Sequence, residues 1–496
     1  PGTCPTDGGK PQWDVQDVRR PWLWSALFAV LPLLGWWTYG LFDLDEGFYA
    51  AIAAEMNRRG EWITPFYNGK PWFEKPILLY WLAKPSLALF GEMVGPRLPS
   101  ILASVGMYAL LAGFARRRMG EVPAMATVLA ASTSLLPVAA GRMMLTDTLL
   151  VLALTGALLC FWEGISTGEP KGKVTAAACL GLAILAKGPV AGAFFLLIAA
   201  LAYWRLPSLR GGFQGGWLLG TLVLVLVVAS WYVPCYLANR EAFVQEFLIE
   251  QNIGRFQGGD RAHKVDMPLG LIFYLPVLAL GMAPWIFRLG PKSAFLRGRD
   301  PLETFLWIWA GTVFGFFTLS GSKLPHYILP AVPPLALLLG LRWGDLPVKK
   351  LLTTGAIASL AIFGIAQGGF SLYYYGGNLA GQRVAGFHAE VHRAARLLRD
   401  QDGKVAVYQM PKRKGKRSPG LRIEETSHPS ILLYLGRNVS PVETLEELAD
   451  QRPAWVLTRA GRLTEIDLVL LRELGLGLTE IEIPGGSEFY RLFRVR

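Results

Sequence analysis

The sequence predicts a polytopic α-helical membrane protein that ends in a small α/β domain. Three observations indicate this fold class. Of 496 residues, 52% are hydrophobic and only 17% are charged, and the mean hydropathy is +0.35. Apolar runs about as long as a bilayer is thick recur between residues 22 and 372. After residue 376 the charge rises, and shorter helical and strand patterns replace these runs.

The basic residues orient the chain in the membrane. Arg19 and Arg20 close a polar tail, residues 1–20, which we place in the cytoplasm, and most later basic clusters fall between apolar runs on the same side. This arrangement predicts eleven crossings within a membrane domain at 21–375. They are 22–39, 97–115, 121–140, 147–165, 174–187, 188–204, 215–236, 268–287, 302–320, 325–341 and 351–372.

The apolar segment 76–92 is predicted to lie at the interface rather than to cross. Lys84 and Pro85 interrupt it, and a crossing there would put the triplet 116–118 on the outer side. The net charge of +12 is explained by the orienting clusters, so we expect membrane lipids and no nucleic acid as partners. The four cysteines stand singly, which indicates neither a CxxC metal pair nor a disulfide framework.

The tail, residues 376–496, is predicted to be an external α/β domain. A helical pattern covers 388–400. Strand-like runs follow at 405–410, 431–435, 454–458 and 489–495. The basic loop 412–417 is either simply solvated or in contact with anionic lipid headgroups.

The same topology gathers polar residues on one face of the membrane. Asp45 and Glu46 follow the first crossing directly, where carboxylates stay hydrated and can reach a lipid headgroup. Taken alone, Glu74 and Lys75 form a surface ion pair, and His263 is polar surface or a metal ligand. The residues that come out external are Asp45, Glu46, Tyr49, Glu74, Lys75, Asp147, Lys187, His263, Lys323 and Tyr327.

Ordered short motifs along the membrane domain resemble one enzyme superfamily. They are D-E-G-F-Y-A-A-I-A-A-E-M at 45–56, G-x-W-I-T-P-F at 60–66, F-E-K-P at 73–76, L-T-D-T at 145–148, A-K-G-P at 186–189 and S-K-L-P-H-Y-I-L-P at 322–330. This set resembles the polyprenyl-phosphate-dependent GT-C glycosyltransferases. These include protein O-mannosyltransferases and the bacterial transferase that adds 4-amino-4-deoxy-L-arabinose to lipid A. The F-E-K-P element favours the second branch, although Phe48 stands where the family's D-E-x-R-Y motif has Arg.

The resemblance implies a GT-C fold and a role for each matched residue. Asp45 corresponds to the family's essential acidic residue, with Asp147 and Glu46 as further catalytic candidates. Glu74 and His263 correspond to a pair that holds a divalent metal, expected to be zinc. The residues implied in binding the carrier phosphate are Lys75, Tyr49, Tyr327 and Lys323.

The activity implied is an inverting sugar transfer from a polyprenyl phosphate to lipid A or another glycolipid or glycan. The enzyme would be a monomer in the bacterial inner membrane, with the active site and the tail in the periplasm. The alternatives are a protein O-mannosyltransferase, a transporter or flippase of lipid-linked sugars, and a ligase or polymerase of lipid-linked oligosaccharides. A transporter would have ionisable residues inside its spans and repeated halves, whereas here Lys187 is the exception in nearly uncharged spans.

Overall fold

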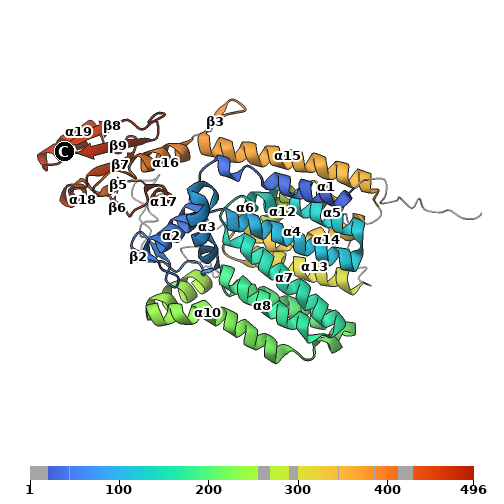
Figure 1. Ribbon diagram of the computed structural model, residues 1–496. Coiled ribbons are helices and arrows are strands. Elements are labelled where there is room, and N and C mark those ends of the chain that lie inside the picture. The colour runs from blue at the N-terminus through green and yellow to red at the C-terminus, as the bar shows by residue number, and fades with distance from the viewer. Residues whose placement is uncertain are drawn as a thin grey trace, which may run out of the picture.

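A bundle of helices makes up most of the molecule, and a small sheet lies at one end of it (Figure 1). The computed structural model describes residues 20–43, 45–254, 268–289, 300–343, 346–384, 386–410 and 428–496. His263 and the basic loop 412–417 lie outside the described residues.

The bundle is formed by elements that coincide with the predicted crossings. They are α1 (Pro21–Val30), η2 (Leu31–Leu33), η3 (Trp36–Thr38), α4 (Leu98–Met119), α5 (Glu121–Ser132), α6 (Leu135–Gly141), α7 (Thr146–Thr167), α8 (Pro170–Lys187), α9 (Val190–Arg205), η4 (Pro207–Phe213), α10 (Trp217–Phe243), η5 (Val244–Gly254), α11 (Leu269–Ile272), α12 (Tyr274–Gly281), η6 (Trp285–Arg288), α13 (Pro301–Leu319), η8 (Pro325–Ala331), α14 (Val332–Trp343) and α15 (Val348–Tyr375).

Several of these crossings are broken rather than continuous helices. In the first, α1 ends at Val30 and short 3-10 turns follow, because Pro32 and the left-handed Gly35 (φ 84°) do not continue a helix. Helices α5 and α6 are bent by 64°. Five helices in the described ranges are long and apolar enough to cross a bilayer, or six if this bent pair is one span. The protein is therefore a polytopic membrane protein, and the number eleven stays a prediction.

The segment between the first two crossings folds against one end of the bundle. It contains α2 (Asp45–Arg59), the hairpin of β1 (Phe66–Tyr67) and β2 (Lys70–Pro71), and α3 (Leu78–Val94). Helix α3 covers the segment predicted to be interfacial and is kinked at Gly91. Figure 1 shows α2 and α3 between the bundle and the terminal sheet.

The C-terminal part is an α/β domain, as predicted. Its sheet has the order β6-β5-β7-β9-β8, with β5 parallel to β6 and β7, and β9 antiparallel to β7 and β8. Its elements are β3 (Gly377–Leu379), β4 (Gln382–Val384), α16 (Phe387–Leu397), β5 (Val405–Tyr408), α17 (Ile431–Leu435), β6 (Ser440–Val442), α18 (Leu445–Gln451), β7 (Trp455–Arg459), α19 (Glu465–Glu473), β8 (Leu478–Ile481) and β9 (Tyr490–Val495).

One predicted strand in this domain is wrong. Residues 431–435 form the helix α17, which ends at Gly436 in the left-handed conformation. All five residues of α17 are buried, so the run is apolar on every side. Periodicity does not distinguish such a short, fully buried helix from a buried strand.

The C-terminal domain is joined to the membrane domain by polar contacts as well as by a continuous apolar core. The side chain of Asn68 makes two hydrogen bonds to the backbone of Val439, both 2.9 Å long. The hydroxyl of Tyr434 accepts a 2.9 Å hydrogen bond from the amide of Leu41, which lies just before α2. The domain thus packs directly on the segment that carries the acidic pair.

Candidate active site

The neighbouring carboxylates Asp45 and Glu46 have different environments. Asp45 opens α2, where the positive end of the helix dipole favours a negative charge, and its side chain is half-buried. Among the described residues it has no ion-pair or hydrogen-bond partner. Glu46, one position further, turns into the protein and is fully buried.

The contacts of Glu46, which was predicted to be catalytic, are structural ones. Its two oxygens accept hydrogen bonds from the guanidinium of Arg97, both 2.8 Å long. They also accept bonds from the amides of Phe42 (2.9 Å) and Met144 (2.7 Å). Arg97 is equally buried and donates further bonds to the carbonyls of the turn that precedes α2. The ion pair of Glu46 and Arg97 fixes the turn that leads into α2. The carboxylate of Glu46 has no position left for a substrate.

Asp147 lies in the first turn of α7 and is almost completely buried. Lys187, the last residue of α8, forms an ion pair with one of its carboxylate oxygens. Nε2 of His326, in η8, is 3.9 Å from the other oxygen. Three elements far apart in sequence therefore converge on this carboxylate. A negative charge that is already neutralised in this way is better suited to positioning than to accepting a proton.

The ammonium of Lys187 also lies over the ring of Tyr327, 4.4 Å from its centroid. The Tyr327 ring packs in turn on Phe317, with centroids 5.5 Å apart. Lys187 and Tyr327 thus form one wall of the site. Sequence analysis named Lys187 as the charged exception in the spans but gave it no role, and it left His326 out although the residue stands inside a matched motif.

Tyr49, Glu74 and Lys75, which were also predicted, lie near the same carboxylates. Burial raises the pKa of Tyr49 well above its usual value, and the nearby carboxylates of Asp45, Glu74 and Asp147 raise it further. Lys75 lies close enough for its positive charge to act on both Asp147 and His326.

Tyr80 was not predicted, and it belongs to this group of residues. Its pKa is raised by burial and by the charges of Glu74 and Asp45, and its hydroxyl has no hydrogen-bond partner in the described part of the chain. A buried hydroxyl without a partner is suited to bind a polar ligand.

Lys323 has a different role from the one predicted. Its ammonium donates hydrogen bonds to the carbonyls of Phe317 (2.9 Å), Thr318 (2.8 Å) and Ser320 (2.9 Å) at the end of α13. A lysine has three N–H donors, so this capping of the helix uses all of them. The structure assigns Lys323 to capping rather than to phosphate binding.

The predicted metal pair is described in part. Glu74 follows β2, and Oε1 of its carboxylate accepts a 3.3 Å hydrogen bond from the side chain of Gln251. Its proposed partner His263 lies outside the described residues. Phe48, which replaces the family's Arg, stacks on Tyr67 and Trp72 with centroids 4.8 and 5.4 Å apart. It strengthens the aromatic cluster beneath α2 and brings no cation to the site.

Known proteins are similar to this chain in sequence and in fold. The sequence model of the dolichyl-phosphate-mannose-protein mannosyltransferase family matches residues 74–232. An undecaprenyl phosphate-alpha-4-amino-4-deoxy-L-arabinose arabinosyl transferase of Pseudomonas fluorescens is 34% identical over 328 residues, and the matched region covers 64% of this chain and 57% of that protein. The enzyme of the same name from Edwardsiella ictaluri is 32% identical over 63% of this chain and 57% of its own length. The chain thus spans less than two thirds of these relatives.

Solved structures extend the likeness in fold to almost the whole chain. ArnT from Cupriavidus metallidurans bound to undecaprenyl phosphate superposes with a TM-score of 0.75 at 19% identity, covering 95% of this chain and 97% of that one. An oligosaccharyltransferase from Archaeoglobus fulgidus gives a TM-score of 0.53 at 11% identity, covering 96% and 74%. In sequence this chain is thus similar to undecaprenyl phosphate-aminoarabinose transferases, and in fold it is similar to ArnT.

Proposed function

We propose that this chain transfers a sugar from a polyprenyl phosphate to an acceptor at the outer face of the membrane. The observation that carries the proposal is that the charges of Asp45, Lys75, Asp147 and Lys187 all act on His326, so these four side chains lie around one point. Asp45 is a half-buried carboxylate, and none of the cations in the described ranges forms an ion pair with it. A carboxylate together with cations suits transfer from a sugar phosphate, because the cations can stabilise the leaving phosphate.

The reaction follows from these positions. The anomeric C–O bond of the donor breaks through an oxocarbenium-like state, and the bond to the acceptor oxygen forms on the opposite face, so the configuration inverts. Lys75 stabilises the departing phosphate, and a well-placed charge of this kind contributes about 3 to 4 kcal/mol. Asp45 takes the proton of an acceptor hydroxyl, worth on the order of 100-fold in rate. An acceptor that is already a phosphate needs no base, and Asp45 then orients the sugar through its amino group.

The donor we propose is undecaprenyl phosphate-linked 4-amino-4-deoxy-L-arabinose, and the acceptor is lipid A in the bacterial inner membrane. The support is the names of relatives that match 64% and 63% of this chain. The test is mass spectrometry of lipid A and of the carrier lipids in cells with and without the gene. We expect the aminoarabinose on lipid A to disappear and its carrier-linked form to accumulate. Unchanged pools would overturn this choice of substrates.

The second candidate is transfer of mannose to protein, which the match of residues 74–232 to the mannosyltransferase family favours. Purified protein supplied with either polyprenyl phosphate mannose or the aminoarabinose donor separates the two. Incorporation of label into protein from the first donor, and none into lipid from the second, would replace the proposal above.

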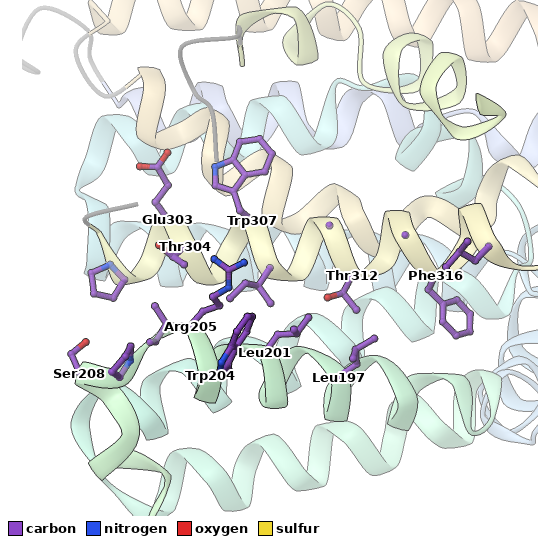
Figure 2. A pocket seen from close by; sticks show the side chains of 17 residues that line it. Leu197, Leu201, Trp204, Arg205, Ser208, Glu303, Thr304, Trp307, Thr312 and Phe316 are labelled. Carbon is purple, nitrogen blue, oxygen red and sulfur yellow. The ribbon is translucent and has the colours of Figure 1, made fainter. Parts of the chain in front are cut away.

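An apolar groove of about 860 Å³ between α9 and α13 gives the carrier a place for its hydrocarbon tail. Figure 2 shows Trp204 and Arg205 at one end, and Leu197 and Phe316 toward the other. Helix α13 ends just before the segment that carries His326, so that second end leads to the site. A polyprenyl chain can lie along such a wall while its phosphate reaches Lys75.

Filling this groove should weaken donor binding. Gly315 lines it, and a Cβ built there meets no atom within 4 Å, so the side chain of Gly315→Leu can start into the groove. We expect the KM for the polyprenyl donor to rise about tenfold, because the tail loses contacts worth about 1.4 kcal/mol. The measurement is donor-dependent kinetics in proteoliposomes. Gly364→Leu on α15 is the matched control, since that glycine also faces open space but lies outside the groove. A raised KM for the acceptor instead would reassign the groove to the acceptor lipid.

We further propose that Glu74 and His263 bind a divalent cation, with zinc as the expected ion. The carboxylate of Glu74 lies at the site and is held by Gln251, and carboxylate with imidazole is a common zinc ligand set. Such a cation would supply positive charge for the leaving phosphate. We expect the bound zinc per chain to fall by one equivalent in His263→Ala and in Glu74→Gln. The zinc content per chain is measured by elemental analysis after dialysis against zinc buffer. Gln251→Ala is the control, because it leaves both ligands in place. Equal metal content in all variants would remove the site.

The site and the C-terminal domain are proposed to face the periplasm. Lys70 and Glu473 are exposed on the segment after α2 and on α19, whereas Lys171 is exposed at the opposite end of the bundle, at the start of α8. In a variant without the native cysteines, single cysteines at the first two positions should react with an impermeant maleimide added to intact spheroplasts. A cysteine at position 171 should react only after lysis. Labelling in the reverse pattern would invert the assigned orientation.

A further inference from the structure

A second group of metal-ligand side chains lies between the C-terminal domain and the membrane domain, away from the site described above. Three of the five histidines in the chain, His388, His392 and His428, surround the single carboxylate of Asp43. All three imidazoles are buried, with exposed fractions of 2% or less. Buried imidazoles gathered on one carboxylate are unusual unless a ligand or a complete hydrogen-bond network satisfies them.

Two of the histidines are placed as a helical ligand pair. His388 and His392 stand four residues apart on α16, so both side chains project from one face of the helix. One ligand atom from each of Asp43, His388 and His392 lies within 4.8 Å of the other two. Two imidazoles and a carboxylate are the protein ligands of many zinc sites that keep a fourth position for water.

His388 supplies the independent observation that points to a ligand. Neither of its ring nitrogens has a hydrogen-bond partner among the described residues, although the side chain is only 1% exposed. Its Nδ1 is 3.7 Å from Oδ2 of Asp43, too far for a hydrogen bond. A buried imidazole without a partner loses the hydration of both nitrogens, and a metal ion at Nδ1 or Nε2 would compensate for that loss.

The other contacts of the group orient the proposed ligands. Nδ1 of His392 is 3.0 Å from the hydroxyl of Tyr374. The ring N–H of His428 donates to Oδ2 of Asp43 (2.9 Å), and the amide of Ser430 donates to Oδ1 (2.9 Å). Outer contacts of this kind fix the tautomer and the direction of metal ligands.

The hydroxyl of Ser430 lies where the ion would have to enter. It is 2.7 Å from Nε2 of His392 and donates to Oδ2 of Asp43 over 2.8 Å. Rotation of this side chain would free both atoms.

We propose that Asp43, His388 and His392 bind a zinc ion that joins the C-terminal domain to the membrane domain. Asp43 stands two residues before Asp45, so an ion held here would also fix the start of α2. That positioning role rests on the proposed function, whereas the zinc site does not depend on it. The three ligands are positioning residues, because none of them touches the candidate active site.

Zinc content in a suitable background tests the site directly. The experiment uses the full chain with His263→Ala, which removes the zinc site proposed at Glu74 and His263. This protein is loaded with zinc alone and then dialysed. We expect about one equivalent of zinc per chain in this background, and less than a fifth of that after adding His388→Gln or Asp43→Asn. Thr458→Val, a buried substitution in the same domain that removes no ligand, should keep the zinc. Equal zinc with and without His388→Gln would overturn the proposal.

Two further measurements guard against a variant that merely misfolds. Cobalt added to the metal-free protein should give the visible absorption of a four-coordinate site, and His388→Gln should lose it while remaining monodisperse. Zinc should raise the Tm of the His263→Ala protein by at least about 2 °C and leave that of the double variant unchanged. If these positions also orient Asp45, His388→Gln lowers kcat with little change in the KM for the donor. Loss of zinc with unchanged kcat would keep the site and remove the positioning role.

Discussion

Asp45→Asn is expected to abolish sugar transfer while the protein still binds the polyprenyl carrier. The amide keeps the shape of the side chain, but it neither accepts a proton nor holds a cationic sugar. We expect a loss of 100-fold or more in kcat, on the order of the contribution of a general base. The structural reason is that Arg97 and Lys187 neutralise Glu46 and Asp147, whereas Asp45 has no ion pair with any residue that the structure describes. The measurement is transfer from a defined donor in proteoliposomes, together with carrier binding in the same preparation.

Two comparisons make the result specific to Asp45. Asp402→Asn, on the exposed surface of the C-terminal domain, should leave the rate unchanged. Lys75→Ala should instead raise the KM for the donor as well as slow turnover, because the phosphate loses a charge-assisted contact. If Asp45→Asn retained full activity, the residue would serve only the start of α2, and the proposed base would have to be another group.

Arg97→Met is expected to destabilise the protein by about 3 to 5 kcal/mol, the largest stability effect that the structure predicts. The substitution leaves the carboxylate of Glu46 buried without its cation. It also removes the donor for the carbonyls of Trp36, Tyr39 and Gly40, which hold the turn before α2. The loss of stability is measured by thermal unfolding in detergent, with the fraction of protein that stays monodisperse as the signal.

A double variant separates the charge from the hydrogen bonds. Glu46→Gln combined with Arg97→Met should be more stable than Arg97→Met alone, because no unpaired charge remains, but less stable than the parent protein, because the carbonyls still lack a donor. The matched control is Arg116→Met, which breaks an ion pair with Glu121 that is largely exposed and should cost less than about 1 kcal/mol. Equal losses for the buried and the exposed pair would contradict the structural role of Arg97.

The metal site formed by Asp43, His388 and His392 shows how different parts of the chain supply one feature. The pair on α16 can be read from the spacing of two histidines in a helical pattern. Asp43 stands more than three hundred residues earlier, and no local pattern connects it to them. The association depends on how the C-terminal domain packs on α2, which is decided by their shared core.

The amino-acid sequence by itself determined the membrane class and much of the group of polar residues that lie near one another. Apolar runs reflect a local requirement, since a segment surrounded by lipid must be apolar along its whole length and must satisfy its own backbone. That is why each predicted crossing coincides with helical elements, and why Asp45, Tyr49, Glu74, Lys75, Asp147 and Tyr327 do lie around one site.

Only the tertiary structure decided what each polar group does. Glu46 and Asp45 are neighbours of the same chemical type, yet one is neutralised by Arg97, 51 positions away, and the other is not. Lys323 resembles a phosphate ligand in sequence but caps α13 with all its donors. The role of a charged group depends on the partners that neutralise it, and those partners come from distant segments. Burial and pairing are therefore settled by packing, which local patterns do not encode.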